Sequence, residues 1–166
     1  MSPQKNIPKS KSGNYWLVKS EPETFSIDDL ANSPDKTTYW DGVRNYQARN
    51  TLRDQMKKGD YVLFYHSNAV PLAVVGIAKV VREGYPDFTA FDPENPHFDP
   101  KSRTDQPTWF MVDLQLVRRF PKPINLERLK LMPELRNMVL VQKGSRLSVQ
   151  PVRANEFETI VGLANQ

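Results

Sequence analysis

The eleven residues from 40 to 50, WDGVRNYQARN, combine aromatic, cationic and amide side chains with hardly an aliphatic residue among them. Trp40 and Tyr46 offer aromatic faces on which a flat ligand could stack, and Arg44 and Arg49 could reach a phosphate. This chemistry is typical of a surface that binds a flat, polar ligand. We therefore take this segment as the first candidate for a functional site.

The same segment carries two amides, Asn45 and Gln47, each of which presents a donor beside an acceptor, as the edge of a nucleobase does. An alternative interpretation is a structural turn, because aromatic residues beside a glycine such as Gly42 often pack a loop against the core. The other polar motifs of the chain favour the ligand-binding interpretation.

Lys19, Ser20 and Glu21 form a polar triplet at the end of an apolar run, and Pro22 restricts Glu21 to extended geometry. Such a triplet can direct a hydroxyl and a carboxylate into the mouth of a barrel. A carboxylate beside an aromatic ring repels phosphate but accepts a hydrogen bond from an exocyclic amine, which suits a nucleobase. We expect Glu21 to recognise a base rather than to catalyse.

The chain has two histidines, which leaves little material for catalysis. His66, followed by Ser67, ends an apolar run and could be either a pocket wall or a structural histidine with its hydrogen bonds satisfied. His97 stands among acidic residues in a proline-rich segment without the regular spacing that fixes metal ligands, so we predict no metal site. No nucleophile elbow, G-x-G-x-x-G or Walker A motif is present, so we predict no catalytic triad and no cofactor.

The surrounding sequence predicts many short strands with a few helices between them. Residues 83–107 hold five prolines together with Tyr85, Phe88, Phe91 and Phe98, which predicts a long ordered excursion fixed by its aromatic residues. The pattern as a whole favours an α+β domain built on a small, partly open β-barrel flanked by short helices. Strands are expected at 15–20, 61–66, 72–82, 108–117, 138–142 and 146–152, and helices after Ser26, over 46–58, over 126–131 and from a cap at Asn155.

The predicted helix over 46–58 would align Arg49, Arg53 and Lys57 on one face, as either a solvated face or a track for phosphates. The net charge of +4 comes mostly from Lys5, Lys9 and Lys11, which leave 20 basic against 19 acidic residues in the rest of the chain. A nearly neutral domain should bind nucleic acid through a shaped pocket with a few well-placed cations.

We expect residues 1–13 to be a basic, disordered tail and residues 14–166 to be one domain. There are no cysteines, no apolar run long enough to span a membrane and no apolar run that could act as a signal peptide. We therefore expect no disulfides, no membrane partner and no export, and we expect a monomer.

Seven segments, in the same order, carry a resemblance to a known family: YWLVKSEP, TTYWDGVRNYQARN, FYHSN, GIAKVV, NPHFDPKS, WFMVDL and RLSVQPV. Together they resemble the EVE domain from about Tyr15 to about Leu163. EVE domains belong to the PUA-like superfamily with the YTH and ASCH domains. The resemblance implies a small β-barrel with helices and a pocket for a modified base in DNA or RNA.

The resemblance also implies roles for particular residues. Lys19 and Ser20 match a pair that lines the pocket entrance in YTH domains, and Trp40 matches the first aromatic residue of their base cage. Trp109 lies where YTH proteins also carry aromatic residues. The candidate base-binding or nucleic-acid-binding residues are therefore Lys19, Ser20, Glu21, Trp40, Arg44, Asn45, Tyr46, Arg49, His66, Ser67 and Trp109.

Two alternatives remain at this point. Some ASCH-type relatives are amidohydrolases, so Lys19 and Glu21 could serve a hydrolase acting on a modified nucleoside or base. The apolar loop from Tyr85 to Phe98 could instead bind a protein. A bacterial protein of this kind would be cytoplasmic, and a eukaryotic one would be nuclear.

Overall fold

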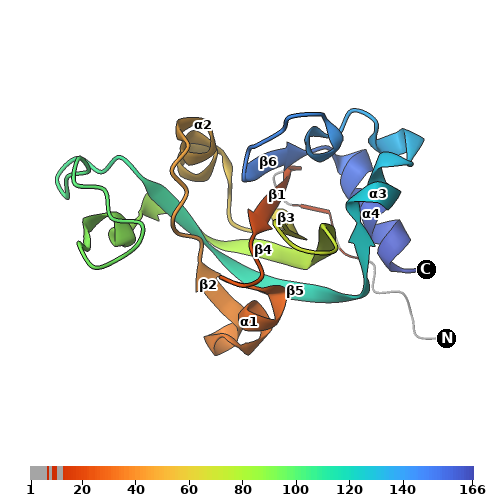
Figure 1. Cartoon of the computed structure of the whole chain (residues 1–166), viewed down its shortest axis with the longest axis horizontal. Coiled ribbons are helices and arrows are strands. Elements are labelled where there is room, and N and C mark those ends of the chain that lie inside the picture. The colour runs from red at the N-terminus through yellow and green to blue at the C-terminus, as the bar shows by residue number, and fades with distance from the viewer. Residues whose placement is uncertain (1–6, 8, 11–12) are drawn as a thin grey trace.

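A computed structural model describes residues 7, 9, 10 and 13–166. Its centre is one six-stranded sheet with the order β2-β5-β4-β3-β1-β6, in which β1 runs parallel to β3 and the other neighbours are antiparallel (Figure 1). Among the described residues β2 does not pair with β6, so the sheet is open, as the sequence predicted. The strands are β1 (Tyr15–Ser20), β2 (Thr37–Tyr39), β3 (Tyr61–His66), β4 (Ala73–Pro86), β5 (Phe110–Asn125) and β6 (Val149–Val152).

Short helices connect and flank the strands. Ser26 caps the first helix in a capping box with Asp29, and Asn45 and Asn125 cap the second and third through their side chains. The α-helices are α1 (Ile27–Asn32), α2 (Tyr46–Asn50), α3 (Leu126–Lys130) and α4 (Ala154–Ala164), with a π-helical turn over Thr51–Gln55 and 3₁₀ turns over Pro34–Lys36, Phe88–Phe91, Pro133–Leu135 and Val139–Val141.

Both faces of the sheet are covered, and β1 shows how the alternation of its residues achieves this. Trp16 and Val18 pack into a core with Trp40 and α2, whereas Tyr15 and Leu17 pack into a second core with α4. Because successive side chains of a strand point to opposite faces, one apolar run serves both cores. The end of β1 is thereby held firmly between two packed layers.

The hairpin of β3 and β4 is confirmed, and Gly76 lies at a bulge in it. A Cβ atom at Gly76 would lie 2.3 Å from Ile27 Cδ1 and 2.5 Å from the carbonyl oxygen of Arg118. The glycine therefore permits the close approach of α1 and β5 that the sequence suggested.

Three element predictions were wrong. The second helix ends at Gln55, not at residue 58, because Met56 is buried in an extended conformation and the Asp60 carboxylate accepts the Lys57 N–H at 2.9 Å. Residues 138–142 form a 3₁₀ turn, not a strand, and Gln142 closes it by donating to the Met138 carbonyl at 3.1 Å. The last helix begins after Arg153, whose N–H donates to Glu156 at 2.8 Å, so Asn155 is not its cap.

The predicted excursion is ordered and extends to one side of the sheet (Figure 1). Phe88 packs edge-on against Tyr39 of β2, with ring centroids 4.9 Å apart, but Phe88 remains 50% exposed and Phe98 37% exposed. The buried anchor is instead polar, since Asp87 and Thr89 are enclosed. The aromatic residues thus contribute less to fixing the segment than the sequence suggested.

Near the amino terminus, Ser10 is buried, and its hydroxyl lies 3.2 Å from the Asp60 carboxylate, which also accepts the indole N–H of Trp16 at 2.8 Å. Most of the tail predicted to be disordered lies outside the described residues. In the part of the chain that the structure describes, no helix is long and apolar enough to cross a membrane.

Candidate functional site

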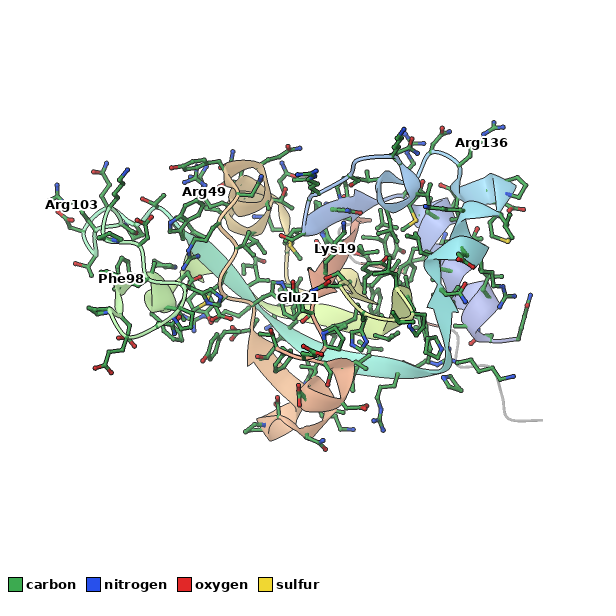
Figure 2. The ribbon with its side chains drawn as sticks, viewed as in Figure 1. Lys19, Glu21, Arg49, Phe98, Arg103 and Arg136 are labelled. Carbon is green, nitrogen blue, oxygen red and sulfur yellow. The ribbon has the colours of Figure 1, made fainter. Side chains whose placement is uncertain are left out.

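A cleft of about 540 Å³ opens where β1 ends. Figure 2 labels two of its residues, Lys19 and Glu21. The end of β1 forms one wall, the chain between β2 and α2 forms the opposite wall, and one residue of the excursion closes a side. Clefts of roughly 300–1,000 Å³ bind small molecules and cofactors. It is lined by Lys19, Ser20, Glu21, Thr24, Phe25, Thr38, Tyr39, Trp40, Asp41, Gly42, Val43, Arg44, His97 and Ser148.

Trp40 is both a cleft residue and a core residue. It is 8% exposed and makes edge contacts with Phe25 and Phe64, at ring-centroid distances of 6.3 and 5.4 Å. Its backbone N–H donates to the Val112 carbonyl at 2.8 Å, which holds it beside β5. Within the described residues its indole Nε1 has no hydrogen-bond partner and is not enclosed, so it can still donate to a ligand. Trp40 therefore packs its loop against the core and also forms part of the cleft wall, so the two interpretations of this residue do not exclude each other.

The polar triplet at the end of β1 faces the cleft as predicted. The Ser20 hydroxyl donates to the Phe25 carbonyl at 2.5 Å, and the Lys19 ammonium donates to the Ser145 carbonyl at 3.4 Å. Burial lowers the pKa of Lys19. The Glu21 side chain is exposed, and its carboxylate has no partner among the described residues. Glu21 is thus the free acceptor of this wall.

His97 also lines the cleft, a position that its acidic, proline-rich sequence context did not predict. Its Nδ1 lies 3.2 Å from the Asp41 carboxylate. Gly42 has a φ of +79°, and a Cβ atom there would lie 2.5 Å from His97 Cε1. The signal for His97 was its place in the NPHFDPKS segment, but nothing in the sequence showed that this loop returns to Gly42.

Arg44 lines the cleft, yet its guanidinium is committed to internal contacts. It donates to the His97 carbonyl at 2.6 Å and to the buried Asp87 carboxylate at 3.0 Å. Burial alone would raise the pKa of Asp87, but hydrogen bonds from Thr89, Gly42 and Arg44 outweigh it and hold that pKa below its usual range. Arg44 therefore fixes the excursion against the cleft wall.

Tyr46, Trp109 and Arg49 lie together, but none of them lines the cleft. The Tyr46 ring stacks on Trp109 at 5.0 Å, and the guanidinium carbon of Arg49 lies 5.1 Å from the centre of the Tyr46 ring. Arg49 also donates to the Thr108 carbonyl at 2.7 Å, and Trp109 donates to Asp99 at 2.7 Å. These side chains hold the excursion on α2.

The other predicted residues also lie outside the cleft. Asn45 uses its side-chain oxygen to cap α2, accepting the Ala48 N–H at 3.0 Å, so it cannot offer a free donor and acceptor pair. His66 Nε2 accepts the Ile27 N–H at 3.1 Å and faces a separate pocket beside Arg119, and burial lowers its pKa. The Ser67 N–H donates to the Ser20 carbonyl at 2.9 Å.

The predicted row of cations on the second helix is also divided among partners. Arg53 pairs with Asp54 at 2.8 Å, and Lys57 lies 3.8 Å from Glu83. Among the residues that the structure describes, no group of three or more histidines and acids is placed to hold a metal ion.

An open six-stranded sheet, short helices and a polar, aromatic cleft at the end of the first strand define an α+β domain of the PUA-like type. The sequence profile of the EVE domain matches residues 14–163. The chain belongs to the EVE domain family.

The relatives are close in both sequence and structure. Mouse thymocyte nuclear protein 1 is 48% identical over 167 residues, which cover 90% of this chain and 73% of the mouse protein. A crystal structure of a Pseudomonas putida protein is 49% identical, with a TM-score of 0.86 over 90% of this chain and 99% of that one. The human THYN1 protein, solved in complex with DNA containing 5-methylcytosine, is 45% identical, with a TM-score of 0.86 over 92% of this chain and 98% of that one.

A Zymomonas mobilis ASCH protein is also similar, with a TM-score of 0.52 over 90% of this chain and 97% of that one, but it is 14% identical, so the likeness shows the fold alone. No contact of Lys19 or Glu21 in the described structure favours the hydrolase alternative. The protein-binding alternative for the loop from Tyr85 to Phe98 stays a prediction.

Proposed function

We propose that this protein binds DNA that carries a modified cytosine and holds the modified base, rotated out of the helix, in the cleft beside Trp40. One observation carries the proposal: the cleft places a free carboxylate, Glu21, together with a nearly buried indole. The human relative in complex with DNA containing 5-methylcytosine supports the same assignment. Location in the nucleus, which the name of the vertebrate relatives suggests, stays a prediction for this chain.

The polar groups of the cleft match cytosine better than thymine. The carboxylate of Glu21 can accept from the exocyclic N4 amine of cytosine, whereas thymine presents a carbonyl oxygen at that position. A hydrogen bond to a charged group contributes about 1.5–3 kcal/mol, which corresponds to roughly 10- to 150-fold in affinity. The Lys19 ammonium, which also lines the cleft, can donate to the base carbonyl.

The apolar side chains of the cleft match a methylated base. Phe25 and Val43 line it beside Trp40, so a 5-methyl group can be buried there. Burial of one methyl-sized group contributes about 0.8 kcal/mol, which is roughly a four-fold preference for 5-methylcytosine over cytosine. Stacking on the indole adds about 1–3 kcal/mol for either base and offsets the cost of unstacking it.

These two preferences can be measured separately with DNA that differs at one central base. Affinities for 5-methylcytosine, cytosine and thymine are compared in fluorescence titrations at fixed salt. Glu21→Gln should lose most of the preference for 5-methylcytosine over thymine, because an amide can donate to the thymine carbonyl, and it should keep the preference over cytosine.

Glu23→Gln is the matched control, because Glu23 is an exposed acid two residues away that does not line the cleft. It should leave both preferences unchanged. A wild-type protein that binds all three DNAs equally would refute the proposal, and so would a Glu21→Gln variant with unaltered discrimination. An RNA of the same sequence, measured in parallel, tests whether the sugar is also distinguished.

A further inference from the structure

The cleft alone does not account for how the DNA backbone is bound. Its free carboxylate, Glu21, would repel phosphate, and Asp41 adds a second acid beside His97. The two arginines that the sequence assigned to phosphate, Arg44 and Arg49, are occupied by internal hydrogen bonds. The phosphates next to the bound base therefore need cations from another part of the surface.

The loop between the last 3₁₀ turn and β6, residues 142–148, carries two such cations, and it reaches the cleft at Ser148. Ser148 lines the cleft and its carbonyl accepts the Lys19 N–H at 2.9 Å, so the loop lies directly beside the end of β1. Lys143 and Arg146 are exposed, and within the described residues neither has a hydrogen-bond or ion-pair partner. In Figure 1 this loop leads into β6, which lies beside β1, and α2 lies to the left of both strands.

The backbone of this loop is held by buried and half-buried groups. Gln150 is fully buried, and its amide nitrogen donates to the Ser145 hydroxyl at 3.2 Å and to the Leu147 carbonyl at 2.8 Å. Lys19 donates to the Ser145 carbonyl at 3.4 Å, and Gly144 forms the turn with a φ of +78°. Two exposed cations on a fixed loop can bind phosphates with little loss of backbone freedom on binding.

We infer that residues 142–148 form a phosphate-binding lip, in which Lys143 and Arg146 contact the backbone phosphates next to the base held in the cleft. This inference rests on the proposed function and names the part of the surface that binds the DNA backbone. The lip supplies affinity for any sequence, whereas the cleft supplies selectivity for the base.

The test is the salt dependence of DNA binding by the full chain, with the double variant Lys143→Ala, Arg146→Ala. Each phosphate contact contributes about 0.9 to the slope of log K against log salt for duplex DNA, so two lost contacts should reduce the slope by about 1.8. At 0.1 M salt, with the affinity at 1 M unchanged, this is a loss of roughly 60-fold. The ratio of affinities for 5-methylcytosine and cytosine should not change.

The matched control is Lys36→Ala, Lys122→Ala, which removes the same charge from two exposed lysines that do not line the cleft. It should change the slope far less than the lip variant. An unchanged slope in the lip variant, or equal changes in both variants, would overturn the inference. Equal affinity of the wild type for methylated and unmethylated DNA would instead refute the proposed function, and a smaller slope in the lip variant would then still support the lip as a DNA contact.

Discussion

Asp87→Asn probes how the cleft wall is held. The Asp87 carboxylate is fully buried and accepts the Gly42 N–H at 2.9 Å and the Arg44 guanidinium at 3.0 Å through the same oxygen. Its other oxygen accepts the Thr89 N–H at 2.8 Å. In the asparagine variant one of these oxygens becomes an NH₂ group, which cannot accept the donors that face it, and Arg44 loses its counter-charge.

Breaking a buried ion pair by removing one partner costs about 3–5 kcal/mol. The Arg44 side chain is 24% exposed, so water can replace part of the lost interaction. We therefore expect the free energy of unfolding to fall by about 2–3 kcal/mol. For a chain of this length that corresponds to a fall in Tm of roughly 4–12 °C. Binding of 5-methylcytosine DNA should weaken as well, because Gly42 and His97 lose their common anchor.

Thermal unfolding followed by circular dichroism measures the stability, and titration well below the Tm of the variant measures the binding. Glu94→Gln is the control, because Glu94 is an exposed acid in the same excursion, and it should leave both quantities within error of the wild type. An Asp87→Asn variant with the Tm of the wild type would refute this account of the cleft wall.

Three further results are expected. The pKa of Asp87 is lower in the folded state, so its contribution to the free energy of unfolding is complete above about pH 5 and is lost as the pH falls through the folded pKa. The Asp87→Asn variant should therefore have a smaller free energy of unfolding at neutral pH, and that free energy should fall less steeply when acid is added. Trp40→Ala should lower the free energy of unfolding by about 3–5 kcal/mol, measured by urea titration, and a cost below about 1 kcal/mol would contradict the packing of this residue. Gly42→Ala should displace the His97 ring and weaken binding more than Gly13→Ala. Both glycines have positive φ, but of the two only Gly42 has a neighbour within 4 Å of an added Cβ. NMR shifts of the imidazole and DNA titrations compare the two variants, and equal losses would show that the ring contact is unimportant.

The sequence predicted the strands and the capped helices well where local chemistry decides them. The alternation in β1 and the capping residues Ser26 and Asn125 act within a few residues, so their effect is visible in the sequence. The apolar run at 138–142 has the composition of a strand, but it forms a turn because its hydrogen bonds are closed locally by Gln142. Composition alone cannot distinguish these outcomes.

Part of the candidate site could also be predicted from local sequence. Lys19, Ser20, Glu21 and Trp40 line one cleft, as predicted, because they stand at or just after the ends of β1 and β2. The internal engagement of Arg44 could not be foreseen, since its partner Asp87 is 43 positions away along the chain. Tyr46 and Arg49 have the types of a nucleic-acid surface, but they hold the excursion, which only the tertiary contacts with Trp109 and Thr108 reveal.

The central claim is that the modified base enters the cleft beside Trp40. The most direct measurement is an isotope-filtered NMR experiment on the complex with DNA that carries one 5-methylcytosine with a ¹³C-labelled methyl group. Nuclear Overhauser effects from that methyl group to the ring protons of Trp40 and Phe25, which line the cleft, are the predicted result. Effects to residues of the separate pocket at His66 and Arg119, or effects to DNA protons alone, would contradict the claim.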